Sequence, residues 1–151
     1  MDTKTWFPPK EDMLTGHRIG IGLGVNVPFE TWAAEITPFL NEVAAYIDMD
    51  PGNLRFDIPD LLERQRVMTA YLGAMSEPYS VAKKYLKVDM GKAILRHKDL
   101  TPSMARMAAE SDCEYQILFA QITDRLNSNL VHLLEAIRDR LSYEKAQMKH
   151  L

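Results

Sequence analysis

The stretch that decides the fold is the last third of the chain, residues 101–151, which read TPSMARMAAESDCEYQILFAQITDRLNSNLVHLLEAIRDRLSYEKAQMKHL. It contains no glycine and no proline after Pro102, and an apolar residue recurs every three or four positions. That spacing places the apolar side chains on one face of an α-helix. Thr101 is a good capping residue and Pro102 suits the first helical position, so this pair predicts where the helix begins.

A helix over residues 102–150 would be about 65 Å long at 1.5 Å per residue, and it cannot bury its apolar face alone. Residues 78–98 form a preceding amphipathic segment, and the short connection 97–100 predicts an antiparallel helical hairpin. That partner reaches only about half as far, so we expect helix 59–75 and a neighbouring subunit to cover the rest. The positions expected at the subunit contact are Leu126, Leu130, Leu133, Leu134, Ile137 and Leu141.

Prolines divide the region before the hairpin. Residues 28–48 read as a helix that Pro38 should break or kink. Asp57 is expected to cap the helix over 59–75. Ser76 is expected to cap a new helix, and a kink is expected here because the residue before Pro78 resists the helical conformation. The sequence therefore predicts an all-α fold, in which additional N-terminal helices precede an antiparallel hairpin with a long C-terminal helix.

Residues 1–27 differ from the rest of the chain. Between Ile19 and Val27, apolar residues alternate with glycine or asparagine, a period of two that is typical of extended chain. Four glycines, at positions 16, 20, 22 and 24, disfavour an isolated stable strand. The spacing of a phosphate-binding glycine loop is absent. We expect residues 1–27 to be an extended arm that orders against another surface, and residues 28–151 to be a single helical domain.

Composition limits the class of protein. The chain has 151 residues, a net charge of −3 and a single cysteine, Cys113, which can form no intrachain disulfide. One free cysteine fits a reducing compartment. The N-terminus lacks the apolar core of a signal peptide, and no apolar stretch approaches the roughly 20 residues of a membrane span. We expect a soluble cytoplasmic protein with no membrane segment.

Motifs for catalysis are weak. The four histidines show no metal-ligand spacing, and no glutamate is followed three residues later by histidine, as di-iron bundles require. No nucleophile elbow is present. We therefore expect a non-catalytic protein with no metal and no cofactor.

Charge is distributed unevenly along the chain. Residues 28–63 carry eight acids and one base, whereas residues 83–98 carry six bases and one acid, Asp89. Basic side chains beside aromatic rings such as Tyr79 and Tyr85 are typical of single-strand nucleic-acid binding. The other interpretation is a solvated helix face that pairs with the acidic segment. The candidate nucleic-acid-binding residues are Lys83, Lys84, Lys87, Lys92 and Arg96.

Two stretches carry a resemblance to a known family: AAESDCEY at 108–115 and LLEAIRDRLSYEKAQMK at 133–149. Upstream, DIPDL at 57–61, Tyr71-Leu72, Tyr79 and Ala82-Lys83 have a similar layout. Over residues 57–150 the chain resembles phage recombination mediators of the UvsY type.

The resemblance implies a ring-like homo-oligomer that binds single-stranded DNA, displaces or remodels a single-strand binding protein and loads a RecA-like recombinase. It implies DNA contacts at the basic residues of the hairpin, matched here by Lys83, Lys84, Lys87, Lys92 and Arg96, with Arg138 and Arg140 as further positions. The alternative hypothesis is a non-catalytic helical oligomeric assembly or adaptor protein of a phage or bacterium, in which the same helices serve only self-association and partner docking.

Overall fold

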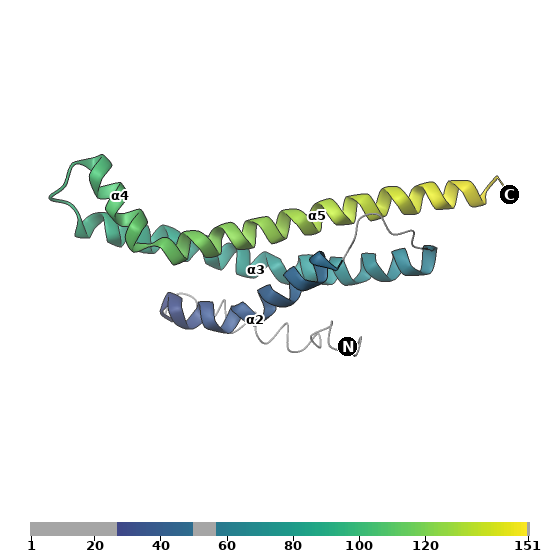
Figure 1. Cartoon of the computed structure of the whole chain (residues 1–151), viewed down its shortest axis with the longest axis horizontal. Helices are drawn as coiled ribbons and strands as arrows, with labels where there is room; N and C mark the ends of the chain where they lie inside the picture. Colours follow the sequence, from purple (N-terminus) through teal and green to yellow (C-terminus); the bar gives the residue numbers. More distant parts are fainter. Residues whose placement is uncertain (1–26, 50–56, 151) are drawn as a thin grey trace.

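The computed structural model describes residues 27–49 and 57–150, and these residues form four α-helices and no strand. The helices are α2 (Phe29–Asp48), α3 (Ile58–Arg96), α4 (Pro102–Asp112) and α5 (Glu114–Met148). As Figure 1 shows, α3 and α5 run antiparallel along most of their length, and α4 lies at the closed end of this hairpin. The all-α class and the antiparallel hairpin are confirmed, whereas the predicted arm lies outside the described residues except for Val27.

The two helix starts that were predicted from capping residues are confirmed. The side chain of Asp57 accepts a hydrogen bond from the backbone N–H of Asp60 at 3.0 Å, at the N-terminus of α3. The hydroxyl of Thr101 accepts from the N–H of Met104 at 3.4 Å, with Pro102 at the start of α4. Both caps satisfy a donor that the first helical turn leaves without a partner.

The expected start of a new helix at Ser76 is wrong, because α3 continues through Pro78 as one helix of 39 residues. The hydroxyl of Ser76 does not cap a new helix, and it donates to the carbonyl of Gly73 at 2.9 Å. An interior proline costs about 3 kcal/mol of helix stability. Met75 and Val81, on either side of Pro78, are buried in the same core as α5, and their burial offsets that cost. Pro38 similarly lies inside α2 without ending it.

The expected single helix over 102–150 is also wrong. Helix α4 ends at Asp112 and α5 begins at Glu114, with Cys113 between them at φ −107° and ψ 25°. A small cluster of buried residues forms at this break, where Ala109 and Cys113 pack against Ala93 of α3. Such small side chains let the helices approach closely, so packing rather than a glycine or proline sets the break.

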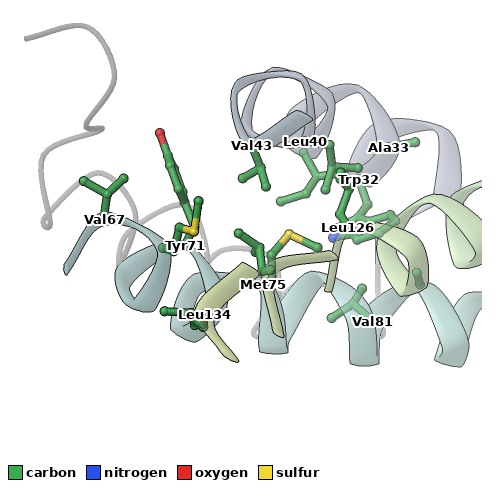
Figure 2. Close-up of a cluster of buried hydrophobic side chains, with 14 of the residues drawn as sticks. Trp32, Ala33, Leu40, Val43, Val67, Tyr71, Met75, Val81, Leu126 and Leu134 are labelled. Carbon is green, nitrogen blue, oxygen red and sulfur yellow. The ribbon is translucent and has the colours of Figure 1, made fainter. Parts of the chain in front are cut away.

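One apolar core joins α2, α3 and α5. In its centre, Tyr71 and Met75 of α3, Val43 of α2 and Leu130 of α5 are at most 1% exposed. Figure 2 shows side chains of α2, among them Trp32 and Leu40, directed toward α3 and α5. Helix α2 therefore covers the groove of the hairpin.

The leucine stripe of α5 lies inside this core. Leu126, Leu130, Leu134, Ile137 and Leu141 are all buried, and Leu133 is partly buried against them. Because α3 runs unbroken from Ile58, it reaches the second half of α5, which the shorter predicted helix did not. The chain itself thus covers the residues that we expected at a subunit contact, and they give no reason to invoke a second subunit.

Candidate nucleic-acid interface

The five candidate basic residues all lie on the last part of α3, and all five are exposed. At 3.6 residues per turn, Lys83, Lys84 and Lys87 fall within an arc of about 100°. We call these three residues the lysine face. By the same spacing, Lys92 and Arg96 point toward a different side of the helix. The structure therefore divides the predicted site into two groups.

The lysine face is open toward solvent. The Nζ atom of Lys83 lies 3.9 Å from the centroid of the Tyr79 ring, a cation–π contact that positions the ammonium group. The hydroxyl of Tyr79 in turn donates to Asp124 at 3.1 Å. Within residues 27–49 and 57–150, no ion pair joins an acid to Lys83, Lys84 or Lys87. Nor does any ion pair between described residues link the acidic segment 28–63 with the basic segment 83–98.

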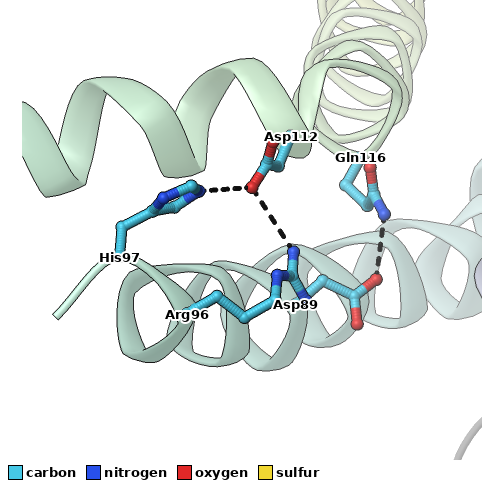
Figure 3. Close-up of polar contacts among 5 residues, drawn as sticks. All are labelled: Asp89, Arg96, His97, Asp112 and Gln116. Atoms are coloured by element: carbon cyan, nitrogen blue, oxygen red, sulfur yellow. Dashed lines mark hydrogen bonds and ion pairs between the residues drawn. The ribbon is translucent and has the colours of Figure 1, made fainter. Parts of the chain in front are cut away.

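Lys92 and Arg96 instead line a cleft of about 330 Å³. The cleft lies between the start of α2, the last turns of α3 and the junction of α4 with α5; its lining residues are Pro28, Phe29, Glu30, Asp89, Lys92, Arg96, Asp112, Cys113 and Gln116. The Nη2 atom of Arg96 lies 3.5 Å from Asp112. Gln116 donates to Asp89 at 3.0 Å, as Figure 3 shows. Three carboxylates, those of Glu30, Asp89 and Asp112, also line the cleft, so it suits a phosphate less than the lysine face does.

The ionisation of the cleft follows from its contacts. The hydrogen bond with His97, assisted by the nearby Arg96, holds the pKa of Asp112 below its ordinary value. Burial raises the pKa of the Cys113 thiol, and the charge of Asp89 raises it further. A thiol with a raised pKa stays protonated at neutral pH and is a poor nucleophile. Cys113 therefore acts here as a packing residue.

Tyr85 was expected beside the basic residues as a ring for base stacking, and the structure places it elsewhere. Its side chain is 8% exposed, and its hydroxyl donates to the main-chain carbonyl of Val27. The ring contacts Phe29 and Trp32 of α2, with ring centroids 5.7 and 5.4 Å away. Burial and the neighbouring acids raise the pKa of Tyr85. Tyr85 therefore anchors the start of α2.

Arg138 and Arg140 lie apart from the other candidates. They are exposed near the C-terminal end of α5, which pairs with the beginning of α3 rather than with its last turns. Arg140 also makes an ion pair with Glu144 at 2.7 Å. The structure does not bring these arginines together with the lysine face.

Sequence reasoning missed the apolar side chains that surround this region. Val88 is 51% exposed and Leu95 is 69% exposed on the same side of α3 as Lys84. Further exposed apolar residues lie at the closed end of the hairpin: Ile94, Leu100, Met104, Met107, Tyr115 and Leu118. The available signal was the order Lys84, Val88, Gly91, Leu95, whose spacing of four, three and four residues places them in one line along a helix.

Comparison with known families, with characterised proteins and with solved structures gave no match. In the part of the chain that the structure describes, no three histidine, cysteine, aspartate or glutamate residues are grouped so that they could hold a metal ion. None of the four described helices is both long enough and apolar enough to cross a membrane.

Proposed function

We propose that this chain is a non-catalytic, cytoplasmic, single-stranded DNA-binding protein that works as a homo-oligomeric recombination mediator. In this role it would remodel DNA coated with a single-strand binding protein and help to load a RecA-like recombinase. The lysine face is the observation that carries the DNA-binding part. Its three exposed ammonium groups lie on one side of α3, and none forms an ion pair with a described acid.

The charge of a single subunit sets how strongly such a face can bind. Lysine–phosphate contacts release counterions whatever the base sequence, so a few lysines give weak and salt-sensitive binding. The net charge of −3 on the whole chain weakens it further. Several lysine faces in one oligomer would act on the same strand and multiply the affinity. A homo-oligomer is therefore part of the proposal.

The recombination role has a separate basis. It rests on the resemblance of residues 57–150 to UvsY-type mediators, which associates basic residues on a helical hairpin with DNA contacts. The observed hairpin with its lysine face is compatible with that resemblance. The partners, a RecA-like recombinase and a single-strand binding protein, come from the resemblance alone.

The test is single-stranded DNA binding measured against salt concentration. We expect affinity to fall steeply as salt rises, and a Lys83→Ala/Lys84→Ala/Lys87→Ala variant to have a shallower slope of log affinity against log salt, by about 2, since each phosphate contact on a single strand contributes about 0.7. The matched control is Arg125→Ala/Lys145→Ala/Lys149→Ala, which removes the same charge from exposed positions of α5 and its C-terminus.

The two variants separate a site from a general charge effect. Equal losses in both would show that only net charge matters and would remove the lysine face from the proposal. Wild-type protein that fails to bind single-stranded DNA at low salt would end the proposal itself. Light scattering of the wild-type protein tests the homo-oligomer independently.

One observation favours the adaptor as a second candidate function. Exposed apolar side chains are concentrated at the closed end of the hairpin, where Met104 and Met107 of α4 are 55% and 70% exposed. Apolar surface gathered in one region is typical of protein contacts. An adaptor would bind a protein partner there and would show no salt-sensitive DNA binding.

A further inference from the structure

The open side of α3 carries an apolar line beside its lysines. Lys84, Val88, Gly91 and Leu95 follow one another at intervals of four, three and four residues, so they lie in a row along the helix. We call these four residues the Lys84–Leu95 stripe. Both of its apolar side chains are more than half exposed. The stripe extends about 16 Å at 1.5 Å per residue, or roughly three helical turns.

The spacing of the stripe is one that helices use to pack against other helices. The opposite side of α3 already has its partners, because Ala82 and Ala93 are fully or almost fully buried in the core clusters. A Cβ atom added at Gly91 would meet nothing within 4 Å, so the surface above this residue is open. A glycine in the middle of the row lets the backbone of a partner come close.

The charges around the stripe are of one sign. Lys83 and Lys87 lie along one edge of it on α3, Lys92 lies along the other edge, and Lys98 follows in the connection to α4. The one acid of this segment, Asp89, accepts a hydrogen bond from Gln116 of α5 and lines the cleft. The complement of an apolar row edged with ammonium groups is an amphipathic helix with acids along the edges of its apolar face.

Within the described residues, the strongly acidic helix of this chain, α2, cannot serve as such a helix in a second copy. The acidic helix of the chain is α2, which contains four acids and no base. Its apolar face, including Trp32, Leu40 and Val43, is buried against its own hairpin. A second copy could therefore present only the polar outer side of α2.

We propose that the Lys84–Leu95 stripe docks an acidic amphipathic helix of a different protein, and that this helix and single-stranded DNA compete for the same lysines. The competition rests on the proposed function, whereas the docking does not. The apolar residues distinguish the two ligands, because phosphate contacts use Lys84 but gain nothing from Val88 or Leu95. Docking would thus regulate DNA binding by exclusion.

The probe is a fluorescent designed peptide of about 18 residues, or five helical turns. It carries leucine at intervals of four, three and four residues and glutamate along both edges of that row. A second peptide with glutamine in place of glutamate is the charge control. Fluorescence anisotropy with the full chain gives both affinities, and labelled oligothymidylate is measured in parallel.

We expect a Val88→Ser/Leu95→Ser variant to bind the acidic peptide about tenfold more weakly, which corresponds to about 1.4 kcal/mol, and to bind oligothymidylate as the wild type does. A Lys84→Ala/Lys87→Ala variant should weaken both. Unlabelled acidic peptide should displace the DNA from the wild-type protein. Both positions of the first variant are exposed, so we expect its helices to remain, and circular dichroism is the check.

The outcomes separate the two proposals. Equal binding of the acidic and glutamine peptides, or unchanged peptide binding by the Val88→Ser/Leu95→Ser variant, would overturn the docking and leave DNA binding intact. Peptide binding without any DNA binding would overturn the proposed function and leave the docking. A change in oligomer size in the Val88→Ser/Leu95→Ser variant would show that the stripe binds a second copy, and the docking proposal would then be wrong.

Discussion

His97 and Asp112 close the end of the hairpin, because the Nε2 atom of His97 lies 2.8 Å from the Oδ2 atom of Asp112. His97 follows the last residue of α3, and Asp112 is the last residue of α4. Arg96 approaches the same carboxylate. One carboxylate thus links the ends of two helices, beside the point where the chain turns into α5 (Figure 3).

This contact predicts a specific dependence of stability on pH. The pKa of Asp112 is lowered in the folded chain, so its stabilisation is fully present above the ordinary aspartate pKa of about 3.9 and is lost as the pH falls through the lower folded value. We expect Asp112→Asn to reduce the free energy of unfolding at about pH 6. The difference from the wild type should shrink as the pH falls below about 4, as measured by urea denaturation at several pH values.

The control for this prediction is Asp139→Asn, at an exposed aspartate of α5 that makes no ion pair with a described residue. It changes the net charge by the same amount. If the destabilisation caused by Asp112→Asn and that caused by Asp139→Asn disappear over the same pH range, the pH dependence of stability reflects the total charge and not the contact with His97.

The burial of Leu130 predicts that the leucine stripe of α5 stabilises the fold within one chain. Its side chain is 0% exposed within one chain, so Leu130→Ala should cost about 2–5 kcal/mol of unfolding free energy. Because the contacts are within the chain, the cost should be the same at protein concentrations roughly tenfold apart. Leu95→Ala, at a position that is 69% exposed, should stay within about 0.5 kcal/mol of the wild type.

A cost of Leu130→Ala that grows with protein concentration would contradict this placement. It would mean that the leucine stripe of α5 lies at a subunit contact, as the sequence alone suggested. Urea denaturation followed by circular dichroism at the two concentrations measures the difference directly.

The cap at Asp57 gives a third prediction. Its carboxylate accepts from the N–H of Asp60 at the start of α3, so Asp57→Ala should cost about 1 kcal/mol. Asp57→Asn keeps an acceptor oxygen and removes a negative charge that raises the pKa of Asp60. We expect the asparagine variant to match or exceed the wild type in thermal unfolding. An alanine variant as stable as the wild type would show that this cap contributes nothing.

The elements that the sequence predicted correctly are those that local chemistry decides. Asp57 and Thr101 cap their helices because a side-chain oxygen and an N–H three residues later are always neighbours at a helix start. The predictions of helix breaks were wrong in two opposite ways. Pro78 did not end a helix, whereas Cys113 stands between two, because packing against α5 and α3 respectively outweighs the local preference.

The candidate site likewise divides into features that the local sequence decides and features that depend on contacts between helices. The sequence located the basic residues on one helix, since charge and helical spacing are local properties. It did not separate Lys84 from Arg96, although helical spacing places them on different sides of α3. The carboxylate beside Arg96 belongs to Asp112 of another helix, so local sequence does not reveal it. It also assigned Tyr85 to a nucleic-acid surface, although this ring lies against Phe29 and Trp32 of α2, far away in the sequence.

The two described helical glycines give the last prediction. A Cβ atom added at Gly73 or at Gly91 would meet nothing within 4 Å, and both residues lie inside α3. Glycine in a helix interior is less stable than alanine by roughly 0.5–1 kcal/mol, so Gly73→Ala and Gly91→Ala should each raise the unfolding free energy by about that amount. Thermal and urea denaturation of the full chain measure both. Because Gly91 belongs to the Lys84–Leu95 stripe, the pair also reports on whether that surface is open. A gain at Gly73 with a loss at Gly91 would mean that another part of the chain, or a second subunit, already packs closely over the stripe.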